Sequence, residues 1–139
     1  MSEIVVGYDG SDGSRASLDR AIELAQELGD SVVVVFGAAA PGVIGGEMAS
    51  HEEAVKERGE QVIKHATDQA AARGFQIEAK MVDEHPVDAL ITEAKSSGAR
   101  MIVVGNQGGP SPLKGALLGA VPFKLVHLSP VPVLVVPAP

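Results

Sequence analysis

The chain has 139 residues, no cysteine and a formal net charge of −7 at pH 7, with 45% hydrophobic and 21% charged residues. This composition predicts one soluble globular domain over residues 1–139, and the lack of cysteine excludes disulfides, thiol catalysis and cysteine metal sites. The acidic balance, without a lysine and arginine cluster, argues against nucleic acid and membranes as partners. No apolar run reaches the ~20 residues that cross a bilayer, so we expect a cytoplasmic protein.

Five short runs rich in β-branched residues predict strands. Four are continuously apolar: EIVVGY (3–8), SVVVVF (31–36), MIVV (101–104) and VPVLVV (131–136). The fifth, QIEAKMV (76–82), alternates and predicts a strand with one less protected face. Continuous apolar strands are typical of a parallel sheet that helices cover on both sides.

Apolar residues at helical spacing predict helices between these strands. The stripes span 18–28, 54–70 and 90–94, the last opened by Pro86, and a shorter fourth helix covers 118–128. Each of the first three ends at a glycine suited to a left-handed cap: Gly29, Gly74 and Gly98. Residues 37–50 (GAAAPGVIGGEMAS) predict a flexible loop. The alternation of strands and helices predicts a doubly wound α/β fold.

Such sheets bind ligands outside the carboxyl ends of their strands, where the strand order reverses. Three segments fall there: Asp9–Ser11, Gly37–Ala39 and the glycine-rich stretch VVGNQGGPSPLKGALLGAVP (103–122). Glycines let backbone N–H groups approach an anion, but they also form plain turns, and the sequence leaves both alternatives open. The stretch matches neither a P-loop nor a Rossmann fingerprint.

Asp9 also has two interpretations. Its carboxylate can accept hydrogen bonds from a ribose or an adenine amino group, or Asp9, Ser11 or Asp12 can simply cap a helix or form a turn. The four histidines lack metal-ligand spacing, and no serine sits in a triad or a nucleophile elbow. No catalytic apparatus is indicated.

Four segments resemble the universal stress protein family in order and spacing. They are IVVGYDGSDGSRASLDRAIELA (4–25), HPVDALITEAKSSGARMIVVGNQG (85–108), LLGAV (117–121) and SPVPVLVVP (129–137). The resemblance implies an α/β fold with a five-stranded parallel sheet of order 3-2-1-4-5, helices on both faces, in a Rossmann-like sandwich of the adenine-nucleotide α-hydrolase type. It also implies a homodimer. For one branch of the family it implies ATP or another adenine nucleotide held by the loop after the fourth strand, with magnesium only if ATP is bound.

That branch carries G-x-x-G, nine residues, then G-[ST]. Gly105 and Gly108 match, Gly119 follows after ten residues, and Ala120 replaces the hydroxyl residue. Pro122 stands where another hydroxyl is common, and only Lys114 and Lys124 lie nearby to offset phosphate charge. Some members of the family that end in a GSVP-like motif bind AMP or cyclic AMP, and GAVP (119–122) is close to it. These departures predict that monophosphates bind better than ATP.

The resemblance assigns Asp9 to the acid that contacts adenosine, and it places Gly37 where the family packs an apolar residue against adenine. The complete implied nucleotide site is Asp9, Gly10, Ser11, Gly37, Val104, Gly105, Gln107, Gly108, Gly109, Gly119, Ala120 and Val121. Three hypotheses follow: a nucleotide-binding stress-response or signalling protein, a nucleotide-free interaction module of the same fold, and a slow ATPase.

The last strand, PVPVLVVP, carries no charge and can recruit another strand at the edge of the sheet. Because proline has no N–H, we expect Pro132 to face away from the sheet, together with Leu134 and Val136. Val131, Val133 and Val135 would then bond inward to the fourth strand. The resemblance implies that the outward edge pairs antiparallel with a second copy.

Overall fold

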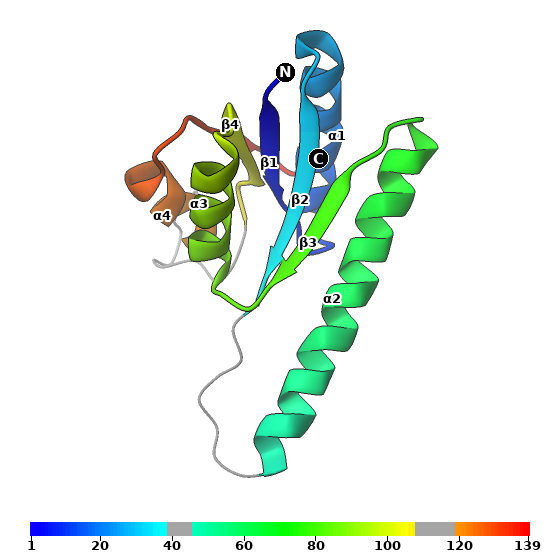
Figure 1. The fold of residues 1–139 in the computed structure, drawn as a ribbon, viewed down its shortest axis with the longest axis vertical. Helices are drawn as coiled ribbons and strands as arrows, with labels where there is room; N and C mark the ends of the chain where they lie inside the picture. The colour runs from blue at the N-terminus through cyan, green and yellow to red at the C-terminus, as the bar shows by residue number, and fades with distance from the viewer. Residues whose placement is uncertain (39–45, 108–118) are drawn as a thin grey trace.

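The computed structural model describes residues 1–38, 46–107 and 119–139, leaving out the side chains of residues 46–52. Strands and helices alternate in the order β1 (Glu3–Gly7), α1 (Asp12–Leu28), β2 (Ser31–Gly37), α2 (Gly46–Ala72), β3 (Glu78–Val82), α3 (Pro86–Ser97), β4 (Met101–Gly105), α4 (Ala120–Leu128) and β5 (Val133–Val136) (Figure 1). All strand pairs are parallel, and the sheet order is β3-β2-β1-β4-β5. The predicted fold class and strand order are confirmed.

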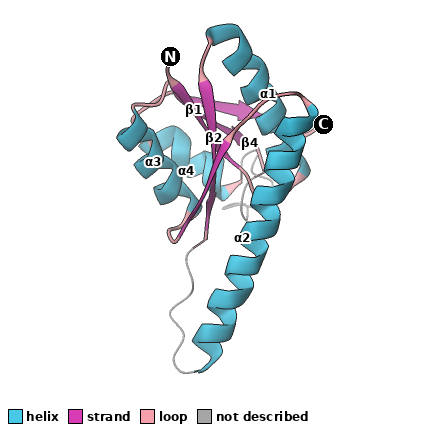
Figure 2. Cartoon of the chain, turned by 45° about the vertical axis from the view of Figure 1, so that its right-hand side comes forward, coloured by secondary structure: helices cyan, strands magenta, loops and turns pink. Residues whose placement is uncertain are grey.

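Two hydrophobic cores lie on opposite faces of the sheet, because side chains alternate along each strand. Ile4 and Val6 of β1 pack with α1 and α2, whereas Val5 packs with α3 and α4. Figure 2 shows the two helical layers separated by the sheet. The central strands are buried on both faces, which explains their continuous apolar sequences.

The predicted helix ends are confirmed by backbone geometry. Gly29, Gly74 and Gly98 all have positive φ angles, of 72°, 70° and 63°, and Pro86 opens α3. The prediction of a loop over residues 37–50 is wrong at both ends, because β2 includes Gly37 and α2 begins at Gly46. Residues 47–49 (Glu-Met-Ala) are good helix formers, so the helix that the downstream stripe nucleates extends back through them. Residues 39–45 lie outside the described residues.

The predicted orientation of the last strand is also wrong. Pro132 and Val136 face β4, since their carbonyls accept hydrogen bonds from Ile102 N (2.9 Å) and Asn106 N (3.2 Å). By alternation the backbone N–H and C=O groups of Leu134 also face β4. Those of Val133 and Val135 therefore point outward along the free edge. Pro132 is tolerated for a simple reason: it precedes β5, where the ladder is only beginning, and it needs only its carbonyl there.

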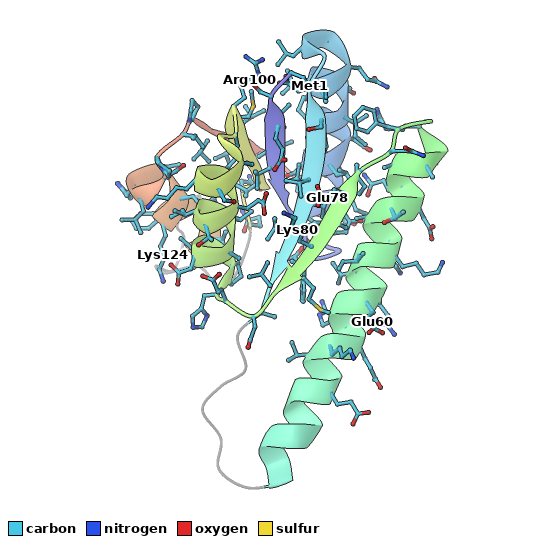
Figure 3. The ribbon with its side chains drawn as sticks, viewed as in Figure 1. Met1, Glu60, Glu78, Lys80, Arg100 and Lys124 are labelled. Carbon is cyan, nitrogen blue, oxygen red and sulfur yellow. The ribbon has the colours of Figure 1, made fainter. Side chains whose placement is uncertain are left out.

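A polar clasp closes the amino end of the sheet. The buried carboxylate of Asp30, just before β2, accepts hydrogen bonds from Ser2 N (3.0 Å) and from the guanidinium of Arg100, just before β4. The hydrogen bonds from Arg100 lower the pKa of Asp30. Figure 3 shows Arg100 and Met1 together at this end of the molecule.

A second polar cluster lies between the sheet and α3. Lys80 of β3 pairs with the buried Glu93 of α3 (Nζ–Oε1, 2.9 Å) and lies 3.8 Å from the carboxylate of Glu78, its neighbour in Figure 3. Burial, followed by contact with the Glu93 carboxyl group, raises the pKa of Glu3 on β1. The Oε1 atom of Glu3 is buried and has no hydrogen-bond partner among the described residues.

Candidate functional site

A cleft opens where β1, β2 and β4 end, at the point where the chain crosses from one half of the sheet to the other. This is the position at which open α/β sheets bind ligands. Its lining comes from the ends of these strands and from the first turns of the helices around them: Gly7, Tyr8, Asp9, Ser11, Gly13, Ser14, Val35, Phe36, Gly37, Pro86, Leu90, Val104, Gly105, Gln107 and Val121.

The structure brings many of the predicted site residues together. Those that line the cleft are Asp9, Ser11, Gly37, Val104, Gly105, Gln107 and Val121. Gly10, Gly119 and Ala120 are not among the lining residues, although Gly10 and Ala120 are each adjacent in sequence to one that is, and Gly119 is two residues from Val121. Gly108 and Gly109 lie outside the described residues.

Sequence reasoning missed the wall that α3 contributes. Pro86 and Leu90 reach the cleft because α3 crosses the sheet over β1 and β2. The apolar stripe of α3 predicted a buried helix face, but not the strands that it covers. Tyr8 was also missed, although it directly precedes Asp9.

The turn between β1 and α1 fixes the polar wall of the cleft. Asp9 Oδ1 accepts a hydrogen bond from Ser11 N (3.0 Å), and the Ser11 hydroxyl oxygen caps α1 by accepting from Ser14 N (3.3 Å). Gly10 between them has φ of 86°, a left-handed conformation that favours glycine. Asp9 therefore closes the turn, and Ser11 is the helix cap.

The charge state of Asp9 follows from its surroundings. Burial raises the pKa of Asp9, but hydrogen bonds from Ser11 and Ser14 outweigh that effect, and the net pKa is lowered. At neutral pH the group is thus an anionic carboxylate that only accepts hydrogen bonds. It is well suited to hydroxyl or amino donors and unsuited to phosphate oxygens.

Close packing explains why two of the predicted site residues are glycines. A Cβ at Gly105 would lie 2.9 Å from the carbonyl carbon of Gly13 and 3.1 Å from its oxygen. A Cβ at Gly37 would lie 2.9 Å from both Pro86 Cα and Ala89 Cβ. The backbones of β4 and β2 thus approach α1 and α3 too closely for a side chain, whether or not a ligand is present.

The amino end of α4 supplies donors close to the end of β4. Gly119 is its N-cap and has no side chain to satisfy the first turn, while its own N–H donates to Asn106 O (2.8 Å). The first N–H groups of α4, including those of Ala120 and Val121, lack partners within the helix. Among the described residues that line the cleft there is no lysine or arginine.

Two classes of site find no support in the part of the chain that the structure describes. No group of three or more histidine, aspartate or glutamate side chains is placed to hold a metal ion there. No helix within those residues is long and apolar enough to cross a membrane.

Comparison with known proteins gives consistent matches over nearly the whole chain. The sequence model of the universal stress protein family matches residues 1–137. Universal stress protein YxiE of Bacillus subtilis is 34% identical over 147 residues, covering 98% of this chain and 99% of that protein. Universal stress protein Rv1636 of Mycobacterium tuberculosis is 35% identical over 140 residues, covering 96% and 94%. A universal stress protein solved in complex with cAMP is 32% identical, covers 99% of this chain and 98% of its own, and has a TM-score of 0.76.

Proposed function

Because the chain belongs to the universal stress protein family, we propose that it binds an adenine nucleotide in the cleft and acts in stress response or signalling. The observation that carries this proposal is the combination of surfaces in the cleft. It joins an acceptor carboxylate, apolar walls and helix N–H groups without intrahelical partners. A nucleotide needs these same surfaces, for the ribose hydroxyls, the base and the phosphate. The relative that is solved with cAMP supports this ligand class.

In the proposed site each wall has one role. Asp9, with Gly10 and Ser11, receives the ribose, and the apolar wall at Val104 receives the base together with Gly37. The phosphate lies at the amino end of α4 and the glycine loop: Gly105, Gln107, Gly108, Gly109, Gly119, Ala120 and Val121. Because Gly37 has no side chain, the base would pack on Pro86 and Leu90 of α3, which line the cleft beside it.

The charge of the cleft favours AMP or cyclic AMP over ATP. Its described lining carries an anionic Asp9 and no cationic side chain. A triphosphate brings about four negative charges, which one helix terminus with roughly half a charge cannot neutralise. Ala120 and Pro122 also lack the hydroxyl donors that β- and γ-phosphates would use. Magnesium would enter only with ATP.

Mass spectrometry of the purified protein for co-purified nucleotide, followed by titration calorimetry with AMP, cyclic AMP and ATP, tests the proposal. We expect both monophosphates to bind more tightly than ATP, and clearly tighter ATP binding would contradict the charge argument. Ala120→Ser should improve ATP binding more than AMP binding, by a charge-assisted hydrogen bond of about 1.5–3 kcal/mol at most. Turnover of ATP with and without magnesium would reveal a slow ATPase.

A nucleotide-free interaction module is the second candidate. It is favoured by the close approach of Gly105 to Gly13 and of Gly37 to α3, which accounts for both glycines without a ligand. No binding of any of the three nucleotides would select this alternative.

We also propose a homodimer that pairs the free edges of two β5 strands antiparallel, with the cytoplasm as its compartment. The strand is uncharged, and Val133 and Val135 direct their N–H and C=O groups outward along that edge. Light scattering after size-exclusion chromatography tests the dimer, and cell fractionation tests the compartment.

A further inference from the structure

Tyr8 is attached to the fold at three points, directly before the proposed ribose-binding residue. Its side chain packs in the core beneath α1 and α2 and is only 3% exposed, while it also lines the cleft. Its backbone N–H donates to Val35 O of β2 (3.3 Å), and its hydroxyl donates to Gln69 Oε1 of α2 (3.0 Å). The next residue in the chain is Asp9.

The partner of Tyr8 is itself held in one orientation. Gln69 Nε2 donates to Arg15 O and to Asp19 Oδ1, both at 2.8 Å, so that both of its N–H groups are used. Turning the amide over would place its oxygen against these two acceptors. Asp19 is held in turn by Arg73, the first residue after α2 (Nε–Oδ1, 3.0 Å). The Tyr8 hydroxyl therefore meets a fixed acceptor.

The turn that carries Asp9 needs an anchor on each side, because Gly10 inside it is the most flexible kind of residue. On the downstream side, the Ser11 cap joins the turn to α1. On the upstream side, the side chain of Tyr8 joins it to α2. We propose that Tyr8 and Gln69 are positioning residues of the cleft, whose hydrogen bond fixes the backbone that presents the Asp9 carboxylate to the ligand. The ligand in this statement rests on the proposed function, whereas the anchoring of the turn does not.

Amide hydrogen exchange of the ligand-free protein tests the anchoring. In Tyr8→Phe, loss of this one hydrogen bond should speed exchange of the Ser11 and Ser14 amides by about five-fold. Gln69→Met, which also loses the bonds to Arg15 O and Asp19 Oδ1, should speed it at least as much. Asp30→Asn is the matched control, because it weakens a buried polar contact at the opposite end of the sheet. It should leave these two amides unchanged. Unaltered exchange in the Tyr8 and Gln69 variants, or equal acceleration in Asp30→Asn, would overturn the inference.

Calorimetry with AMP then tests the consequence for binding. Each single variant should bind several-fold more weakly than the wild type, and Tyr8→Phe/Gln69→Met no more weakly than Gln69→Met alone, because that substitution already removes the bond to Tyr8. Asp30→Asn should bind as the wild type does, even if its melting temperature falls. Wild-type affinity in Tyr8→Phe would refute the positioning role. Accelerated exchange together with a wild type that binds no nucleotide would instead refute the proposed function and leave the anchoring supported.

Discussion

The Gly105→Ala variant tests whether packing or ligand binding requires a glycine at position 105. The new Cβ would lie 2.9 Å from the carbonyl carbon of Gly13, and both the carbon and its oxygen belong to rigid backbone. An ordinary contact starts near 3.4 Å, so α1 and β4 must separate by about half an ångström. Overpacking of this kind costs about 1–3 kcal/mol. We therefore expect Gly105→Ala to lower the free energy of unfolding by about 2 kcal/mol in the absence of any nucleotide.

Gly13→Ala is the matched control, because it adds the same methyl group on the other side of the same contact. Its Cβ would lie 3.8 Å from Gly105 Cα, an ordinary distance, and alanine is favoured over glycine in a helix by up to about 1 kcal/mol. Urea unfolding of the two variants should show Gly13→Ala at least as stable as the wild type. Equal stabilities for Gly105→Ala and the wild type would refute the packing argument and return Gly105 to a ligand-binding role.

Three further predictions concern the cleft, the sheet edge and the carboxyl group of Glu3. Asp9→Ala should abolish most of the melting-temperature shift that AMP produces, and loss of its hydrogen bond from Ser11 N should cost about 1 kcal/mol in the unliganded protein; an unchanged shift would remove Asp9 from the site. Val135→Pro should give a folded monomer by light scattering and circular dichroism, because its N–H faces outward, whereas Leu134→Pro should disrupt the inner ladder; a folded Val135→Pro dimer would contradict the proposed edge. The pKa of Glu3 is higher in the folded protein than its ordinary value of 4.5. Wild-type stability should therefore fall as the pH rises from 4.5 through the pKa of Glu3 in the folded protein. Glu3→Gln should flatten that decline in urea unfolding between pH 4 and 8, and an unaltered pH profile would show that Glu3 is not its source.

Local sequence predicted the elements whose cause is local. The apolar runs of β1 and β2 and the left-handed Gly29 each follow from their own few residues, and they are confirmed. The proline rule gives the wrong orientation for β5 because it assumes that Pro132 lies inside the strand, whereas β5 begins at Val133. Where the ladder begins depends on β4, and the sequence of β5 does not contain that information.

Local sequence likewise predicts some features of the cleft and not others. The position of Asp9 could be predicted because it follows a strand at the point where strand order reverses. The contact of Gly105 with Gly13 and the arrival of Pro86 could not, since each depends on how a helix crosses strands that are distant in sequence. The sequence pattern thus identified where the cleft lies, but not why particular glycines are there.

The clasp of Ser2 with Asp30 has a practical consequence for sensor design. Met1 is fully exposed at the end of β1 opposite the cleft, and the residue after it is fastened to the fold. Tethering the protein to a chip through residue 1 would hold it firmly and leave the cleft facing the flowing solution. A tether at Pro139 would instead crowd the groove between α1 and β5, which that residue helps to line. Surface-based kinetics on this protein are therefore best recorded with the amino end immobilised.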